Sequence, residues 1–192
     1  MPSEKRCCSV LVVSGKKQNT ALLSAMLDSS VYRPVDFALS AGEAKRKLLR
    51  SAFDIIIIDP PLPDGFGTDF ALDATADTRA GILMMVRSDL FETTCRKVED
   101  AGVLTLAKPV SKSDFYTALK LITATNARLL NEEKKTRRLQ DKLEETKLVS
   151  RAKIILMEKM KISEPEAHRY IEKEAMDSRR TRKEVAEQII NG

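Results

Sequence analysis

Few side chains in this sequence have the types and the spacing that catalysis requires. The most conspicuous carboxylate, Asp59, directly follows four consecutive isoleucines, and Lys108 closes a later apolar run. Asp59 is therefore predicted to end a buried strand, and Lys108 directly follows the last predicted strand. The sequence has no paired carboxylates, no nucleophile with a neighbouring base and no phosphate-binding glycine loop. We therefore do not expect an enzyme.

Cysteine and histidine, which bind many metal ions in proteins, are scarce in this sequence. The cysteines Cys7, Cys8 and Cys95 are odd in number and lack a Cys-x-x-Cys spacing, which favours reduced thiols. The single histidine, His168, has no cysteine or histidine near it and is expected to be a packed or half-exposed side chain. We therefore predict no metal site and no cofactor.

Basic residues gather in short clusters near the C-terminus. The net charge of +5 is modest and does not by itself indicate nucleic-acid binding. The distribution is more informative, because clusters with interspersed acids suit contact with the phosphates of a structured nucleic acid. The alternative is that these side chains are ordinary solvated charges. The candidate contacts are Arg151, Lys153, Arg179, Arg180, Arg182 and Lys183.

The length of 192 residues suits one ordinary domain with a small appendage. No apolar run approaches the length that spans a bilayer. The first apolar stretch, Val10–Val13, is too short for the core of a signal peptide and is typical of a strand. We therefore expect a cytoplasmic protein.

The first part of the chain alternates short apolar strands with amphipathic helices. Such an order predicts an α/β doubly wound, five-stranded parallel sheet. In the first helix the apolar residues at helical spacing are Ala21, Leu22, Ala25 and Met26. Strands are predicted at Ser9–Val13, Val35–Leu39, Asp54–Asp59, Ile82–Val86 and Val103–Ala107, and helices at Gln18–Leu27, Ala41–Ala52, Asp69–Ala76 and Phe91–Ala101.

From Lys112 the pattern changes to a long polar helix, or two helices with a frayed joint. Neither Gly nor Pro occurs between Val110 and Lys161. A diluted heptad pattern favours a dimerising coiled coil, and the alternative is a solvated connector helix. The seam residues, spaced seven apart, are Ile122, Leu129, Thr136 and Leu143.

After Lys161 the sequence predicts a small helical unit. Ser163, followed by Pro165 and Glu166, marks a helix start, and Asp177–Ser178 is expected to end that helix. A last helix is expected to start near Thr181. Two alanines, Ala152 and Ala167, are expected at close-packing positions. The other predicted core residues are Ile154, Ile155, Met157, Met160, Met176, Val185, Ala186, Ile189 and Ile190.

The order of the elements, the segment 55–67 (IIIIDPPLPDGFG) and the segment 107–109 (AKP) resemble the response-regulator receiver domain. The resemblance covers residues 7–125. It implies that Asp59 matches the phosphoacceptor of that family and that Lys108 matches the lysine that pairs with it.

The receiver chemistry needs further residues that are missing here. Receivers carry an acidic pair after the first strand, where this chain has Ser14 and Gly15, and a hydroxyl after the fourth strand, where it has Val86. Ser88 and Asp89 lie off register. Without the acids the affinity for Mg²⁺ should fall sharply. We therefore expect a pseudo-receiver that dimerises or senses a protein partner, with Asp59 paired to Lys108 rather than phosphorylated.

The C-terminal segments resemble the ANTAR family of transcription antitermination regulators. The matching segments are 150–160 (SRAKIILMEKM), 162–174 (ISEPEAHRYIEKE), 175–178 (AMDS) and 182–190 (RKEVAEQII). The resemblance implies a three-helix domain that binds hairpins in nascent RNA and prevents terminator formation. His168 departs from the family, which often has an aromatic residue such as Phe there.

These observations predict a receiver-like domain at 7–125, a coiled-coil linker at 126–147 and an ANTAR domain at 148–192. The expected partners are RNA hairpins, a second copy of the chain through the coiled coil, and a regulatory protein. Two other functions stay open on the residues alone. Short helices with a basic last helix also suit a DNA-binding response regulator, and the helices could instead bind protein in a signalling adaptor.

Overall fold

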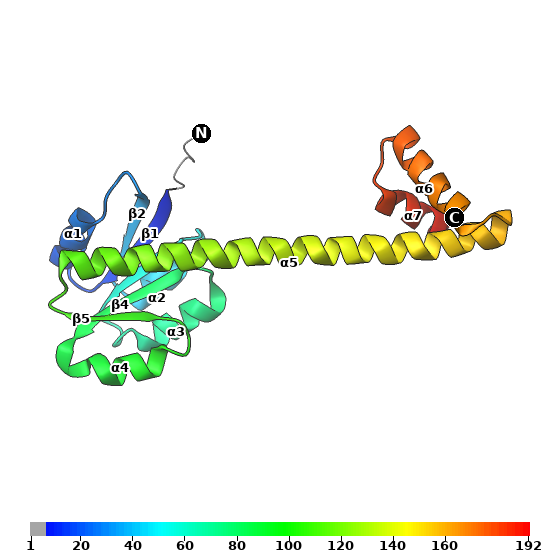
Figure 1. Cartoon of the computed structure of the whole chain (residues 1–192). Coiled ribbons are helices and arrows are strands. Elements are labelled where there is room, and N and C mark those ends of the chain that lie inside the picture. Colours follow the sequence, from blue (N-terminus) through cyan, green and yellow to red (C-terminus); the bar gives the residue numbers. More distant parts are fainter. Residues whose placement is uncertain (1–6) are drawn as a thin grey trace. The chain divides into compact units, whose positions relative to one another are not determined.

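The computed structural model describes residues 7–192, and the chain divides into two compact units that meet in sequence at Leu129 and Leu130. The N-terminal unit contains the sheet and helices α1 to α4, and the C-terminal unit contains α6 and α7 (Figure 1). Helix α5 (Lys112–Met160) contributes its first turns to one unit and its last turns to the other. Each unit has a hydrophobic core of its own.

The N-terminal unit is built on a five-stranded parallel sheet in the order β2-β1-β3-β4-β5. This order confirms the doubly wound sheet that the sequence predicts. It places β3, with its isoleucines, at the centre, where both faces are covered. The strands are β1 (Cys8–Ser14), β2 (Tyr32–Ala38), β3 (Ile55–Asp59), β4 (Gly81–Arg87) and β5 (Leu104–Lys108).

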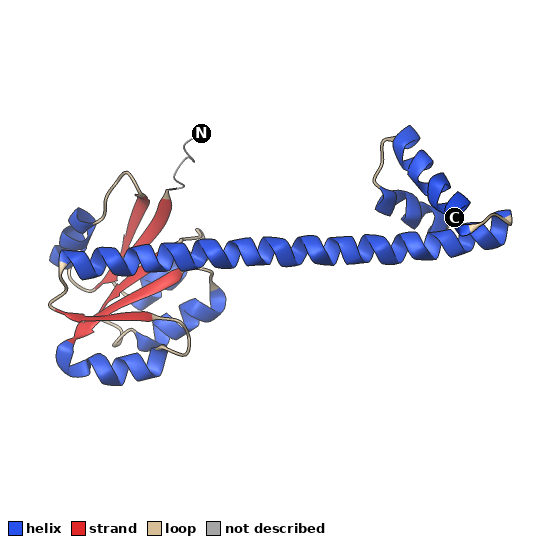
Figure 2. Cartoon of the chain, in the orientation of Figure 1, coloured by secondary structure: helices blue, strands red, loops and turns tan. Residues whose placement is uncertain are grey.

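The isoleucines of β3 divide between two core layers because successive side chains of a strand point to opposite faces. Ile56 and Ile58 pack in the layer beneath α2 (Ala41–Leu48), α3 (Thr68–Asp77) and α4 (Phe91–Val98). Ile55 and Ile57 pack in the layer beneath α1 (Lys17–Met26) and the start of α5. Figure 2 shows the strands of this sheet with the helices around them. The sheet is thus buried on both faces.

The apolar face of α1 differs from the sequence prediction. Leu22 is 67% exposed, whereas Leu23 and Leu27 are buried against the sheet. The predicted face with Leu22 and the observed face with Leu23 and Leu27 both have helical spacing. Only the packing of the helix against the sheet selects between these two faces. Helix α2 is also shorter than predicted and ends at Leu48, leaving Ala52 exposed.

Helix α5 is continuous over 49 residues, so the alternative of two helices with a frayed joint is wrong. Its first turns bury Phe115, Leu119 and Ile122 in the receiver-like core. Ile122 lies so close to Gly81 that an ideal Cβ there would be 2.2 Å from its Cγ2 atom. Ile122 therefore belongs to that core and not to the heptad seam. No helix among the described residues has the length and apolar character that crossing a membrane needs.

The C-terminal unit packs the end of α5 against α6 (Glu164–Ser178) and α7 (Arg182–Asn191). Both short helices begin with capping boxes, formed by Ser163 with Glu166 and by Thr181 with Glu184. Helix α6 ends where Arg179 adopts a left-handed backbone conformation with φ of 54°, just after the predicted break at Asp177–Ser178.

The core of the C-terminal unit contains smaller residues than the sequence suggested. Ala152 and Ala167 are fully buried, which confirms them as close-packing positions, and Leu156, Ile171 and Val185 pack around them. Four residues predicted to be core are instead exposed, because the buried faces of the helices are taken by these other residues. These residues are Ile154, Met157, Met160 and Met176.

Candidate functional site

The carboxylate of Asp59 lies at the carboxyl edge of the sheet and is only 4% exposed. Parallel pairing of β1 with β3 sets Ser14 directly opposite Asp59, and Ser14 is fully buried. Lys108 ends β5 at the same edge, and its ammonium group forms an ion pair with Oδ1 of Asp59. The structure thus brings together the two residues that the sequence singled out.

Both oxygens of the Asp59 carboxylate have protein donors. Oδ2 accepts hydrogen bonds of 2.7 Å from the Ser14 hydroxyl and of 2.7 Å from the Asn19 side-chain amide. Lys108 also donates to the carbonyl oxygen of Pro60 at 3.1 Å, which ties the loop after β3. Sequence reasoning missed Asn19. The available signal was its position in the first turn of α1, which starts at this edge of the sheet.

These contacts keep Asp59 ionised. Burial raises the pKa of Asp59, but hydrogen bonds from Lys108, Ser14 and Asn19 together outweigh it, so that the pKa lies below its ordinary value. A buried carboxylate that is paired and hydrogen-bonded in this way is a stable structural element. The geometry agrees with pairing between Asp59 and Lys108 as the role of this aspartate.

The residues around Asp59 do not fit a Mg²⁺ ion. An ideal Cβ on Gly15 would lie 3.0 Å from Cδ of Pro63 and 3.3 Å from the carbonyl oxygen of Pro61, which leaves little room for an acidic side chain. Residues 7–192 contain no cluster of three His, Cys, Asp or Glu side chains that could hold a metal ion. Mg²⁺ prefers carboxylate ligands beside open water positions, and here both oxygens of the one carboxylate already have protein partners.

The segment after β4 has no free hydroxyl at the Asp59 site either. Val86 is buried at 1% exposure. The Ser88 hydroxyl donates to the backbone carbonyl of Lys108, and Asp89 pairs with Arg87. Neither off-register residue therefore replaces the hydroxyl that receivers use to contact the phosphate.

In the C-terminal unit, three of the predicted contact residues surround one hollow. Arg179, Arg180 and Arg182 line it together with Glu172, Ala175 and Met176, and its volume is about 470 Å³. Met176 is 79% exposed, so an apolar surface lies beside the guanidinium groups. Arginine guanidinium planes can stack on an unstacked nucleic-acid base, and their charges suit phosphate.

The other predicted contacts lie outside this hollow. Arg151 is exposed on α5. Lys153, also on α5, has a side chain only 19% exposed and forms a 2.6 Å ion pair with Glu164. Lys183 lies in the first turn of α7 and donates a 2.7 Å hydrogen bond to Glu144. The six residues therefore do not form one uniform patch.

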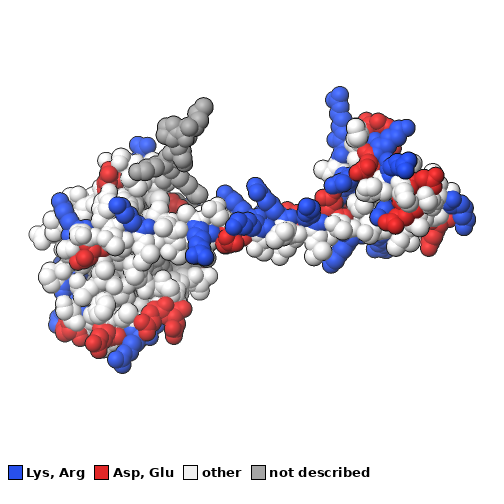
Figure 3. All heavy atoms as spheres, viewed as in Figure 1, with Lys and Arg blue, Asp and Glu red and all other residues white. Residues whose placement is uncertain are grey.

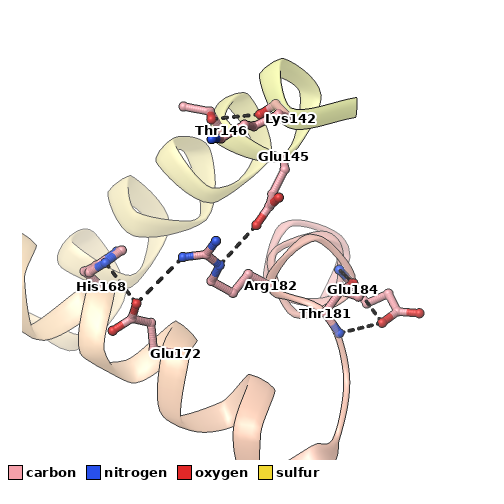
Figure 4. A network of polar contacts seen from close by, with 8 residues as sticks. All are labelled: Lys142, Glu145, Thr146, His168, Glu172, Thr181, Arg182 and Glu184. Carbon is pink, nitrogen blue, oxygen red and sulfur yellow. Dashed lines mark hydrogen bonds and ion pairs between the residues drawn. The ribbon is translucent and has the colours of Figure 1, made fainter. Parts of the chain in front are cut away.

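Acidic side chains accompany the basic ones throughout the C-terminal unit. Figure 3 shows Lys and Arg interspersed with Asp and Glu on its visible face. Arg182 lies at the centre of one network, with Nε 3.1 Å from Glu145 and Nη1 3.7 Å from Glu172 (Figure 4). Oε1 of Glu172 also lies 3.4 Å from Nε2 of His168, and His168 is half-exposed as expected.

Comparison with known proteins agrees with both halves of this description. Residues 137–190 match the model of the ANTAR domain. The transcriptional regulatory protein PdtaR of Mycobacterium tuberculosis is 33% identical over 172 residues, which cover 88% of this chain and 82% of PdtaR. The match to PdtaR therefore extends over both units.

Solved structures resemble the N-terminal part of the chain. The chemotaxis response regulator CheY4 of Vibrio cholerae is 23% identical with a TM-score of 0.54, and the match covers 61% of this chain and 99% of CheY4. A response-regulator receiver protein of Methanospirillum hungatei is 22% identical with a TM-score of 0.58, covering 64% of this chain and 98% of that one. At these identities the likeness establishes the fold alone, which is that of receiver domains.

Proposed function

The chain belongs to the family of response regulators that join a receiver domain to a C-terminal ANTAR domain, and from this premise we propose that it binds hairpins in nascent RNA. Through that binding it would prevent terminator formation and so act as an antitermination regulator. The relative PdtaR is named as a transcriptional regulatory protein, which supports a role of this chain in the control of transcription.

The grouping of Arg179, Arg180 and Arg182 around one hollow is the observation that carries this proposal. Their guanidinium groups can contact phosphates and stack on bases, and Met176 supplies an apolar surface beside them. The hollow suits an unpaired base with its phosphate better than the regular edge of a duplex, because duplex bases stay stacked. A hairpin loop offers such bases.

The receiver domain serves in this proposal as a dimerisation or input module. The Asp59 carboxylate is held by Lys108, Ser14 and Asn19, so control by aspartyl phosphorylation is not part of the proposal. A regulatory protein that docks on the receiver is the alternative source of input. No catalytic activity is proposed, and the site of action is the cytoplasm, where nascent RNA is available.

We propose that two chains pair along α5 as a coiled coil. Leu129, Leu139 and Leu143 are 57%, 69% and 57% exposed there. Exposed leucines at heptad-related positions of a long helix are typical of a seam that a second helix covers. A dimer would present two ANTAR domains, which suits an RNA target with two stems.

Two measurements test the proposed function. Crosslinking RNA to the full chain in cells, followed by sequencing, identifies the bound hairpins. Titration of the chain with one recovered hairpin and with duplex DNA of the same sequence, at one salt concentration, should then give tighter binding to the hairpin. Preference for the duplex would make the protein a DNA-binding response regulator. Salt-insensitive capture of a protein without nucleic acid would favour a signalling adaptor.

A further inference from the structure

Two consecutive basic residues in the first turn of α7 form ion pairs with two consecutive glutamates of α5. Arg182 Nε lies 3.1 Å from Oε1 of Glu145, and Lys183 Nζ lies 2.7 Å from Oε2 of Glu144. All of these residues belong to the C-terminal unit, and each basic residue is 37 or 39 positions from its partner in the sequence. The contacts therefore depend on how α7 docks on α5.

Both basic residues are among the candidate RNA contacts, and their charges are neutralised within the protein. The hydrogen bond to Glu144 raises the pKa of Lys183. Arg182 also pairs with a second carboxylate, because its Nη1 lies 3.7 Å from Glu172 (Figure 4). Among the described residues, Arg182 is the one arginine of the hollow that forms an ion pair, and one of its two partners, Glu172, also lines the hollow.

We propose that Glu144 and Glu145 form an autoinhibitory pair that competes with RNA for Arg182 and Lys183. This inference rests on the proposed function and deepens it. A carboxylate and a phosphate take the same geometry on a guanidinium or ammonium donor. The glutamates therefore compete with RNA phosphates for these two side chains.

The ion pairs of Glu144 and Glu145 with Arg182 and Lys183, called the latch below, are modest in strength. Modest strength suits regulation because the pairs can open reversibly. The paired side chains are between 32% and 58% exposed, so solvent and salt screen them. An exposed ion pair changes an equilibrium by about 1.4-fold to 5-fold, so two pairs change it by roughly 2-fold to 30-fold. The latch would raise the RNA concentration that binding requires without blocking binding.

The test compares two full-length double variants that lose the same charge. Glu144→Gln with Glu145→Gln removes the latch. Glu158→Gln with Glu174→Gln removes two exposed carboxylates that form no ion pair among the described residues. The probe is a fluorescently labelled hairpin recovered by crosslinking. The control is essential because any loss of negative charge tightens RNA binding nonspecifically.

We expect the Glu144/Glu145 variant to bind the hairpin between about 2-fold and 30-fold more tightly than the Glu158/Glu174 variant at low salt. The difference should shrink at high salt as the pairs are screened. The latch variant should also unfold at slightly lower denaturant concentration. A purely structural role for the glutamates would instead weaken RNA binding together with stability.

Equal hairpin affinity of the two double variants would overturn the autoinhibitory pair and leave the proposed function standing. Absence of hairpin binding by the wild-type chain and by both variants would overturn the proposed function, and the competition with it. The two failures are therefore distinguishable in one titration series.

Discussion

The side-chain amide of Asn19 donates a 2.7 Å hydrogen bond to Oδ2 of Asp59, the same oxygen that accepts from Ser14. Lys108 pairs with the other oxygen, so the carboxylate has neutral donors at Oδ2 and a cation at Oδ1. A phosphoacceptor needs an oxygen free to attack and a cation that neutralises the transferred group. Here the space and the lone pairs of Asp59 are used by the protein.

We expect that incubation with a small phosphodonor and Mg²⁺ leaves the chain unphosphorylated. The attacking oxygen is already hydrogen-bonded, and there is little room at Gly15 for the acid that would bind Mg²⁺. Intact mass spectrometry measures the result, with a receiver that has the full acidic pair as the positive control. Stoichiometric addition of phosphate, lost in Asp59→Asn, would show that the carboxylate still acts as a phosphoacceptor.

The pair of Asp59 and Lys108 should contribute to the stability of the receiver unit. Asp59→Asn is expected to lower the free energy of unfolding by about 1–3 kcal/mol, because it leaves Lys108 without its counter-charge. Combination with Lys108→Met should cost less than the sum of the single changes. The exposed pair of Lys45 and Asp73, both 53% exposed, is the control, and its coupling in the same cycle should be below about 1 kcal/mol. Equal coupling for the two pairs would contradict the argument.

The stabilisation by Asp59 should disappear on acidification. Burial raises the pKa of Asp59, but its hydrogen bonds lower it by more, so the folded-state pKa lies below the ordinary value of 3.8. A group with a lowered pKa contributes stability above its unfolded-state pKa and loses it as the pH falls through its folded-state pKa. The difference in stability between wild type and Asp59→Asn should therefore be constant near neutrality and narrow below about pH 3.8. Denaturant titrations across this range measure it, and a difference that widens on acidification would refute it.

The fold of the receiver unit was predictable because its strongest signal is local. The isoleucines of β3 and the regular return of short apolar runs specify a covered parallel sheet. The choice between Leu22 and Leu23 on α1 was not predictable, since it depends on how the helix docks. Asn19 was missed for a related reason. Its role arises only when the end of β1 brings α1 beside Asp59.

In the C-terminal unit, too, some features were predictable from the sequence and others were not. The cap at Ser163 and the helix start near Thr181 were predictable because start signals act within one turn. The apolar residues of α5, in contrast, outnumber the core positions, and Met157 and Met160 lie outside. The clusters of basic residues were visible in the sequence, but the glutamates that pair with them were not. Such pairs form between helices that are distant in the chain.

The exposed leucines of α5 should hold a dimer together. Leu139→Glu with Leu143→Glu is expected to convert the chain to a monomer, because charges in a coiled-coil seam repel across the pair and lose apolar burial. Sedimentation equilibrium measures the mass. Leu22→Glu with Leu49→Glu places the same charges on leucines that are 67% and 87% exposed in the receiver unit, and should leave the mass unchanged. An unchanged mass for the α5 variant would remove the coiled coil from the proposal.

Arg179 offers a test of RNA contact that separates binding from stability. Its backbone is left-handed with φ of 54°, a conformation that glycine adopts more readily. Arg179→Gly should therefore keep or slightly raise the stability of the C-terminal unit while it removes one guanidinium group from the hollow. Hairpin binding should weaken about threefold to tenfold at low salt, and the slope of log K against log salt should flatten by about 0.7–0.9. Arg169→Ala removes the same charge from an exposed position of α6 that does not line the hollow. It should have a much smaller effect on both quantities. If the two variants weaken binding equally, the hollow has no special role and the RNA responds only to net charge.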